Sequence, residues 1–230
     1  MTHKGYTDME IESFKHDVLN RYKDNLIDVV RKNLINGSSY FFEHKDIKDD
    51  EYFIKKDLSN SLNIHPNNIL IVGSAKLGFS IKPEKNRLDH KFNKFRFEDI
   101  DGKKESDIDI AIIDSSLFEE KLQMLYHYLI GFSDSKINEF FNDCSEKRIS
   151  PCFYGFSRYT LMGWLRPDQM PIGFNLFKDI EEIQSKYRKR YNIKINVGIY
   201  KSWFYFENYN IQNLKNMQQV LKLSGEYNEQ

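Results

Sequence analysis

The sequence predicts an α+β fold in which a small mixed sheet is flanked by helices, with a helical extension at the N-terminus. Long stretches carry apolar residues at three- and four-residue steps, which indicates amphipathic helices. Three short apolar runs bounded by turn residues, at 69–72, 108–113 and 193–200, indicate buried strands. Because these strands alternate with helices, we expect helices packed on a sheet. The strands are too few for a doubly wound sheet or a barrel.

The N-terminal part of the chain is predicted to be helical throughout. One continuous helix is expected over residues 8–35, where the apolar stripe is unbroken, and a second helix over 49–62. The first strand begins soon after the second helix ends. We therefore divide the chain into a helical N-terminal portion, residues 1–65, packed on a domain at 66–230 that has a helical C-terminus.

The remaining segments predict further helices and two long connections. Residues 82–105 are polar and of mixed charge, which is typical of a long loop. Residues 149–175 hold three of the five prolines and are expected to be mostly loop. Helical periodicity returns in four segments: 115–130, 135–148, 176–190 and 202–223.

Composition restricts the class of protein. Lys+Arg and Asp+Glu are both 34, so the formal net charge is +0, and a uniformly basic nucleic-acid coat is excluded. No apolar run approaches the roughly 18 residues that a membrane span requires, and the first residues are polar. Two cysteines, Cys144 and Cys152, cannot build a disulfide framework. We therefore expect a cytoplasmic protein with no membrane partner.

Two motifs carry residues suited to chemistry. The first is Gly73-Ser74, which follows the first strand and offers a backbone that a ligand can approach closely, together with a hydroxyl suited to a phosphate. The second is Asp107-Ile108-Asp109, which opens the second strand. Since alternate residues of a strand share a face, the two aspartates project together. Their mutual repulsion would be relieved by a hard divalent cation such as Mg²⁺.

A Gly-Ser turn followed by an Asp-x-Asp strand resembles the nucleotidyltransferase superfamily, the group that shares the DNA polymerase β palm. The resemblance covers residues 66–114 and is greatest to small bacterial members, including minimal, toxin-type and defence-associated enzymes. It implies a nucleotidyltransferase fold, Mg²⁺ or Mn²⁺ as cofactor and a nucleoside triphosphate (NTP) as substrate. It also implies that Gly73 and Ser74 hold the nucleotide's phosphates, while Asp107 and Asp109 bind the metal.

Two features depart from the family's pattern. Ser74 and Asp107 are 33 positions apart, which indicates an insertion between the motifs. The superfamily usually places a third carboxylate on a later strand, and the run at 193–200 offers Asn196 there. Asparagine can ligate Mg²⁺ through its carbonyl oxygen but is a poor general base. We take Asp107, Asp109 and Asn196 as the catalytic set. Other carboxylates that could complete it are Asp114, Glu105 and Asp101.

Basic residues lie close to both motifs. Lys76 follows Ser74 closely enough to neutralise phosphate charge, although a solvated lysine in a first helical turn is an equal alternative. Two basic clusters interleaved with aromatic residues, at 82–97 and 186–194, suit a phosphate backbone and stacked bases. Charged loops and helix ends are also often merely solvated. The segment 163–171 carries Trp164, Arg166 and Asp168 between glycine and proline residues. It is either a substrate-gating or base-stacking loop, or a structural loop that plugs the core with the indole of Trp164.

The leading expectation is Mg²⁺-dependent transfer of a nucleotidyl group from an NTP to a hydroxyl or phosphate acceptor. RNA, for instance a tRNA end, or a protein is the favoured acceptor. A role as a toxin or in phage defence rests on the resemblance alone. The alternative, which Asn196 favours, is a degenerate module that binds nucleotide or a partner protein without catalysis. A third reading is an assembly protein that uses its aromatic C-terminal helix.

Overall fold

A mixed sheet lies at the centre of the computed structural model. The structure describes residues 3–23, 25–81, 92–99, 104–131, 151–171 and 173–223. Within these ranges the sheet has the order β1-β2-β4-β3, built from β1 (Ile69–Val72), β2 (Ile108–Ile113), β3 (Trp164–Leu165) and β4 (Ile195–Tyr200). Strands β2 and β4 are parallel, whereas β1 and β3 are antiparallel to their neighbours. The predicted α+β class with a small mixed sheet is confirmed.

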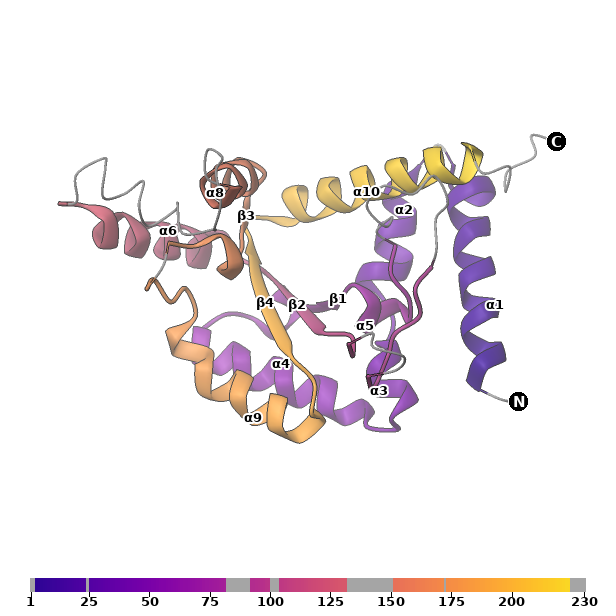
Figure 1. The fold of residues 1–230 in the computed structure, drawn as a ribbon, viewed down its shortest axis with the longest axis horizontal. Helices are drawn as coiled ribbons and strands as arrows, with labels where there is room; N and C mark the ends of the chain where they lie inside the picture. The colour runs from indigo at the N-terminus through magenta and orange to yellow at the C-terminus, as the bar shows by residue number, and fades with distance from the viewer. Residues whose placement is uncertain are drawn as a thin grey trace.

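Helices cover both faces of this sheet. Figure 1 shows α4 and α9 on one side and α10 crossing the other. The helices are α1 (His3–His16), α2 (Leu26–Val29), α3 (Tyr40–His44), α4 (Lys48–Leu62), α5 (Ser74–Leu77), α6 (Ser115–Leu129), α8 (Pro151–Leu161), α9 (Glu181–Tyr191) and α10 (Trp203–Leu223). Short 3₁₀ or π-helical turns are η1 (Asp17–Arg21), η2 (Val30–Ile35), η3 (Pro66–Asn68), η4 (Pro167–Gln169) and η5 (Lys178–Ile180). Over the ranges described, a helix with the length and apolarity to cross a bilayer is not found.

The alternation of side chains along the strands separates two hydrophobic cores. Ile110 and Ile112 of β2 face the core that contains residues of α3, α4 and α9. Ala111 and Ile113 face the other core, which contains residues of α1, α2 and α10. Both cores combine residues from before and after position 65, so the N-terminal helices pack directly on the sheet.

The predicted continuous helix over 8–35 is wrong, because one helical run ends at Arg21 and the next begins at Leu26. The break brings buried Asp17 into an ion pair with Lys32. It also lets both halves pack against α10, whose Gln218 donates through Nε2 to the carbonyl of Val18 at 2.7 Å. Tertiary contacts therefore divide a stripe that looks uniform in sequence.

The predicted loop at 149–175 is also wrong in part, since it contains α8 and β3. The predicted helix at 176–190 begins later, as α9, after the turn η5. The other predicted helices and strands of the described part of the chain lie within two residues of their expected limits. The predicted helix at 135–148, residues 82–91 and 100–103 of the first long connection, and Cys144 lie outside the described residues.

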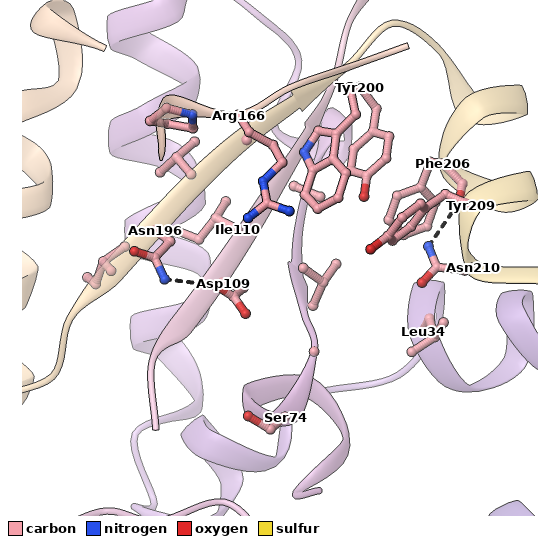
Figure 2. Close-up of a pocket in the computed structure, with 18 of the residues that line it drawn as sticks. Leu34, Ser74, Asp109, Ile110, Arg166, Asn196, Tyr200, Phe206, Tyr209 and Asn210 are labelled. Carbon is pink, nitrogen blue, oxygen red and sulfur yellow. Dashed lines mark hydrogen bonds between the residues drawn. The ribbon is translucent and has the colours of Figure 1, made fainter. Parts of the chain in front are cut away.

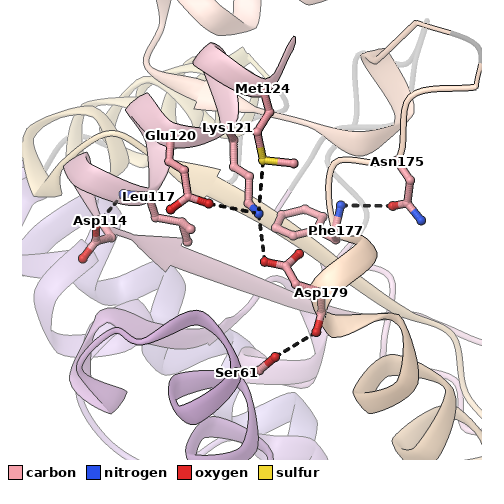
Figure 3. A network of polar contacts seen from close by, with 9 residues as sticks. All are labelled: Ser61, Asp114, Leu117, Glu120, Lys121, Met124, Asn175, Phe177 and Asp179. Carbon is pink, nitrogen blue, oxygen red and sulfur yellow. Dashed lines mark hydrogen bonds and ion pairs between the residues drawn. The ribbon is translucent and has the colours of Figure 1, made fainter. Parts of the chain in front are cut away.

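A buried lysine joins three elements beside the sheet (Figure 3). Lys121 of α6 is only 2% exposed, and its ammonium group donates to Asp179 Oδ2 at 2.8 Å. Ser61 of α4 in turn donates to the backbone carbonyl of Asp179 at 2.8 Å. Because a buried ammonium needs a partner, this network fixes α6 and α4 relative to η5.

Candidate functional site

The three predicted catalytic residues lie together. Asp109 of β2 is paired in register with Asn196 of β4, so both side chains project from the same face of the sheet. The Asn196 amide donates through Nδ2 to Asp107 Oδ2 and to Asp109 Oδ1, each at 3.0 Å. Figure 2 shows the second of these bonds. The parallel pairing of β2 and β4 thus converts two distant sequence positions into one cluster.

The Gly73-Ser74 turn approaches this cluster from β1. Gly73 has φ +66°, a conformation that favours glycine, and a Cβ at this position would lie 3.2 Å from Asp109 Oδ2. Glycine therefore allows the turn to pass close to the carboxylate. Ser74 follows immediately and lines the same pocket as Asp109. In Figure 2 it lies on the opposite side of Asp109 from Arg166.

These residues border a pocket of about 620 Å³. This volume is within the range of roughly 300–1,000 Å³ typical of small-molecule sites. Residues of β1, β2, β4 and α10 line it, together with the segment after β3. One end carries Ser74, Asp109 and Asn196, and the other is lined by aromatic and amide side chains that include Tyr200 and Asn210.

Lys76 lies apart from the other predicted site residues. Its ammonium group donates to the backbone carbonyl of Gly37, and it is not among the residues that line the pocket. The side chain is buried, and this burial lowers the pKa of Lys76. The structure therefore associates Lys76 with the packing of α5 rather than with the two aspartates.

Asp114 and Glu105, the two described alternatives for a third carboxylate, both make their contacts with residues other than Asp107 and Asp109. Asp114 follows the far end of β2 and caps α6, accepting from Leu117 N at 2.8 Å. Glu105 contacts Asp99 instead, through its side chain and through its backbone amide, which donates to Asp99 Oδ1 at 2.7 Å. Asp101 lies outside the described residues. In the described part of the chain, a group of three or more His, Cys, Asp or Glu able to hold a metal is absent.

The donor set is therefore two carboxylates and one amide. The Nδ2 group of Asn196 is placed between the carboxylates, where a cation would otherwise relieve their repulsion. Rotation of the amide by half a turn would exchange Nδ2 for Oδ1 and leave three oxygen ligands. Oxygen ligands of this kind suit Mg²⁺, which usually keeps water and substrate phosphates in its remaining positions. The residues present thus fit such an ion.

Arg166, which belongs to the segment 163–171 that the sequence marked as a gating or structural loop, lines the pocket. It follows β3, and its guanidinium binds Asp168 in a two-point contact of 2.9 and 2.7 Å. It also lies over the rings of Tyr159 and Trp164, at 4.6 and 4.8 Å from the centroids. These contacts hold a cation in the wall of the pocket.

Trp164 fits the structural alternative better than the base-stacking one. Its indole is stacked on Tyr200, with 5.0 Å between centroids and 10° between planes. Edge contacts with Tyr159 and Tyr209, at 5.2 and 4.8 Å, complete an aromatic cluster. Because these rings pack against one another, the cluster forms a rigid part of the pocket wall.

Substitution of Gly198 is expected to disrupt this wall. A Cβ at Gly198 would lie 2.6 Å from Trp164 Nε1, so Gly198→Ala must displace the indole. We expect a loss of about 1–3 kcal/mol in the free energy of unfolding, the usual cost of overpacking. Denaturant unfolding and near-ultraviolet circular dichroism measure it. In a Trp164→Leu background the same substitution should cost much less, and an equal cost there would contradict this account.

The basic clusters are partly engaged in ion pairs. In the second cluster, Lys186 donates to Asp57 at 2.7 Å and Arg190 to Asp50 at 2.8 Å, which ties α9 to α4. In the first cluster, Lys94 pairs with Asp8 at 2.5 Å, and residues 82–91 lie outside the described part. Contact of these clusters with nucleic acid stays a prediction.

No protein-family model, curated protein or solved structure matches this chain.

Proposed function

We propose that this protein is a metal-dependent nucleotidyltransferase that moves a nucleotidyl group from an NTP to a hydroxyl or phosphate acceptor. One observation carries the proposal. Asp107, Asp109 and Asn196 converge within hydrogen-bonding distance, directly beside the Gly73-Ser74 turn, at the edge of a pocket of nucleotide size. A cluster of two carboxylates has little structural purpose, because the pair repel each other at the sheet surface.

The proposed reaction forms a bond between an acceptor oxygen and the α-phosphorus of the NTP. The bond from that phosphorus to its bridging oxygen breaks, pyrophosphate leaves, and the acceptor's proton passes to an aspartate carboxylate or to solvent. The Ser74 hydroxyl and the backbone at Gly73 would bind the phosphates that leave. A divalent cation held by Asp107 and Asp109 would supply positive charge at the transferring phosphoryl group.

Asn196 would hold the two aspartates in place and would not itself accept a proton. A neutral amide does not take a proton near pH 7, so the acceptor's proton must go to an aspartate or to solvent. Its hydrogen bonds to both aspartates hold their side chains on one face of the sheet. This arrangement orients the two carboxylates before a ligand arrives.

One observation favours a second candidate, a nucleotide-binding module without turnover. Asn196 satisfies an oxygen of each aspartate without any cation, which a catalytic site with three carboxylates could not do. Such a module would still bind nucleotide in the same pocket. Turnover alone separates the two candidates.

The test supplies each of the four NTPs, labelled with ³²P at the α-phosphate, with Mg²⁺ or Mn²⁺. Total RNA and cell lysate serve as acceptors, and the Asp107→Ala, Asp109→Ala double variant is the control. We expect label in an acceptor with the wild type only. Nucleotide binding measured by calorimetry without any label transfer would favour the binding module. Neither label nor binding would contradict both candidates.

A further inference from the structure

The upper wall of the pocket presents a group of hydrogen-bond donors that the proposed catalytic set does not use. Figure 2 shows the guanidinium of Arg166 and the hydroxyls of Tyr200 and Tyr209 directed into the cavity. All three residues line the pocket together with Asp109 and Ser74. They come from the segment after β3, from β4 and from α10, so only the folded chain brings them together.

Tyr200 is the most informative of the three. The side chain is 4% exposed, yet its hydroxyl has no hydrogen-bond partner among the residues that the structure describes. Burial raises the pKa of Tyr200 well above its usual value; the neighbouring Tyr209 adds to this effect and the Arg166 guanidinium opposes it. The phenol therefore stays protonated and can donate. A hydroxyl that faces a cavity without a protein partner is free to donate to water or to a ligand bound there.

Arg166 contributes further donors from a fixed position. Its two-point contact with Asp168 uses two of the five N–H groups of a guanidinium, and the described residues provide no other hydrogen bond to it. The remaining three N–H groups are available on the side away from Asp168. Stacking on the rings of Tyr159 and Trp164 limits the freedom of the side chain.

The ring faces in this wall are not available for a nucleobase. Tyr200 is stacked on Trp164, and its edge contact with Phe206 has a centroid distance of 5.2 Å. Tyr209 packs against the same indole at 4.8 Å. The wall therefore offers convergent N–H and O–H donors rather than a stacking surface. An oxyanion, which accepts several hydrogen bonds at once, is the ligand class that fits such donors.

We propose that Arg166, Tyr200 and Tyr209 form a phosphate-binding subsite of this pocket. The proposal rests on the proposed function, since it places a phosphate of one substrate beside the aspartate pair. Figure 2 places Arg166 and Ser74 on opposite sides of Asp109. Since in-line transfer puts the attacking and leaving oxygens on opposite sides of the phosphorus, a phosphate of the acceptor suits the Arg166 side. The terminal phosphates of the NTP are the other possible occupants of this subsite, since they are oxyanions of the same kind.

The test compares phosphorylated and unphosphorylated probes by calorimetry in the presence of Mg²⁺. One pair is a short oligoribonucleotide with and without a 5′-phosphate, and the other is the α,β-methylene analogue of ATP and adenosine. Tyr200→Phe removes only the hydroxyl and keeps the ring packing. We expect it to weaken binding of a phosphorylated probe about tenfold, a typical cost for one hydrogen bond to a charged group, and to leave its unphosphorylated partner unchanged.

Two further variants sharpen the comparison. Arg166→Lys keeps the charge but loses the planar arrangement of N–H donors. It is expected to weaken binding of the same phosphorylated probes as Tyr200→Phe. Tyr205→Phe is the matched control, because it removes a hydroxyl from α10 at a residue that does not line the pocket. An effect confined to the oligonucleotide assigns the phosphate to the acceptor, and one confined to the ATP analogue assigns it to the NTP. Either result supports the subsite.

Other results would overturn the subsite. These are equal loss for phosphorylated and unphosphorylated probes, no change in any probe, or no binding of a phosphorylated probe by the wild type. Label transfer by the wild type with unchanged affinities in Tyr200→Phe would reject the subsite and keep the proposed function. Tyr200-dependent binding of a phosphorylated probe without any label transfer would keep the subsite and reject catalysis.

Discussion

Asp109→Asn is expected to lower nucleotidyl transfer by about a thousandfold. The substitution keeps the shape of the side chain but removes one of the two negative charges that would hold a cation beside the transferring phosphate. Loss of about 4 kcal/mol of transition-state stabilisation corresponds to roughly this factor. The rate is measured as transfer of ³²P-labelled nucleotide at saturating NTP.

The same variant separates metal binding from folding. Mg²⁺ should raise the melting temperature of the wild type and should have almost no effect on Asp109→Asn. Asp114→Asn is the matched control, because it makes the same change just beyond the other end of β2 and asparagine still caps α6. Retention of full transfer by Asp109→Asn, or an equal loss in Asp114→Asn, would contradict the assignment of the site.

Asn196→Asp is expected to destabilise the protein unless a divalent cation is present. The new carboxylate would replace an amide that donates at 3.0 Å to both Asp107 and Asp109, so two attractive contacts become repulsive. Repulsion of about 2–3 kcal/mol, after partial proton uptake, corresponds to a fall of roughly 5–10 °C in melting temperature for a chain of this size. Scanning calorimetry with EDTA measures it.

Both Mg²⁺ and a lower pH should reverse the fall in melting temperature of Asn196→Asp. Mg²⁺ is expected to restore the melting temperature of Asn196→Asp and to raise it more than it raises the wild type, since a third carboxylate adds a charged ligand. Lowering the pH should also narrow the difference, because the three carboxyl groups then share protons. Asn213→Asp makes the same change elsewhere in the pocket and should show neither response. A melting temperature of Asn196→Asp that ignores Mg²⁺ would argue against a metal site.

The activity of Asn196→Asp also distinguishes the two candidate functions. If the wild type transfers nucleotide slowly because it lacks a third carboxylate, this variant should transfer faster. If the site only binds nucleotide, restoring a carboxylate is expected to increase Mg²⁺-dependent affinity without producing turnover.

Local pattern was sufficient for the strands that build the site. The runs at 69–72 and 108–113 are apolar, short and bounded by turn residues, and β1 and β2 have the same limits. Alternation along the second run placed Asp107 and Asp109 on one face, and both accept a hydrogen bond from the same amide. These features depend on neighbours one or two residues away, which is why periodicity reports them.

Local pattern failed where distant contacts compete with it. The apolar stripe over 8–35 continues across the turn, so only the pairing of Asp17 with Lys32 and the packing against α10 reveal the break. Composition suggested a loop at 149–175, yet Gly155 lies inside α8 and the other glycines and prolines stand at or beyond the ends of α8 and β3. Glycine and proline content does not distinguish a long loop from short elements joined by tight turns.

The sequence by itself determined the α+β class, the Gly73-Ser74 turn and the shared face of the two aspartates, because each depends on short-range geometry. The tertiary structure decided the contact of Asn196 with that pair, through the parallel register of β2 and β4. It also decided which hydrogen-bond donors face the pocket, since the pairing of Trp164 with Tyr200 across β3 and β4 brings Arg166 to the same pocket. Strand register is fixed by packing over the whole sheet, so residues far apart in the chain become neighbours only in the folded protein.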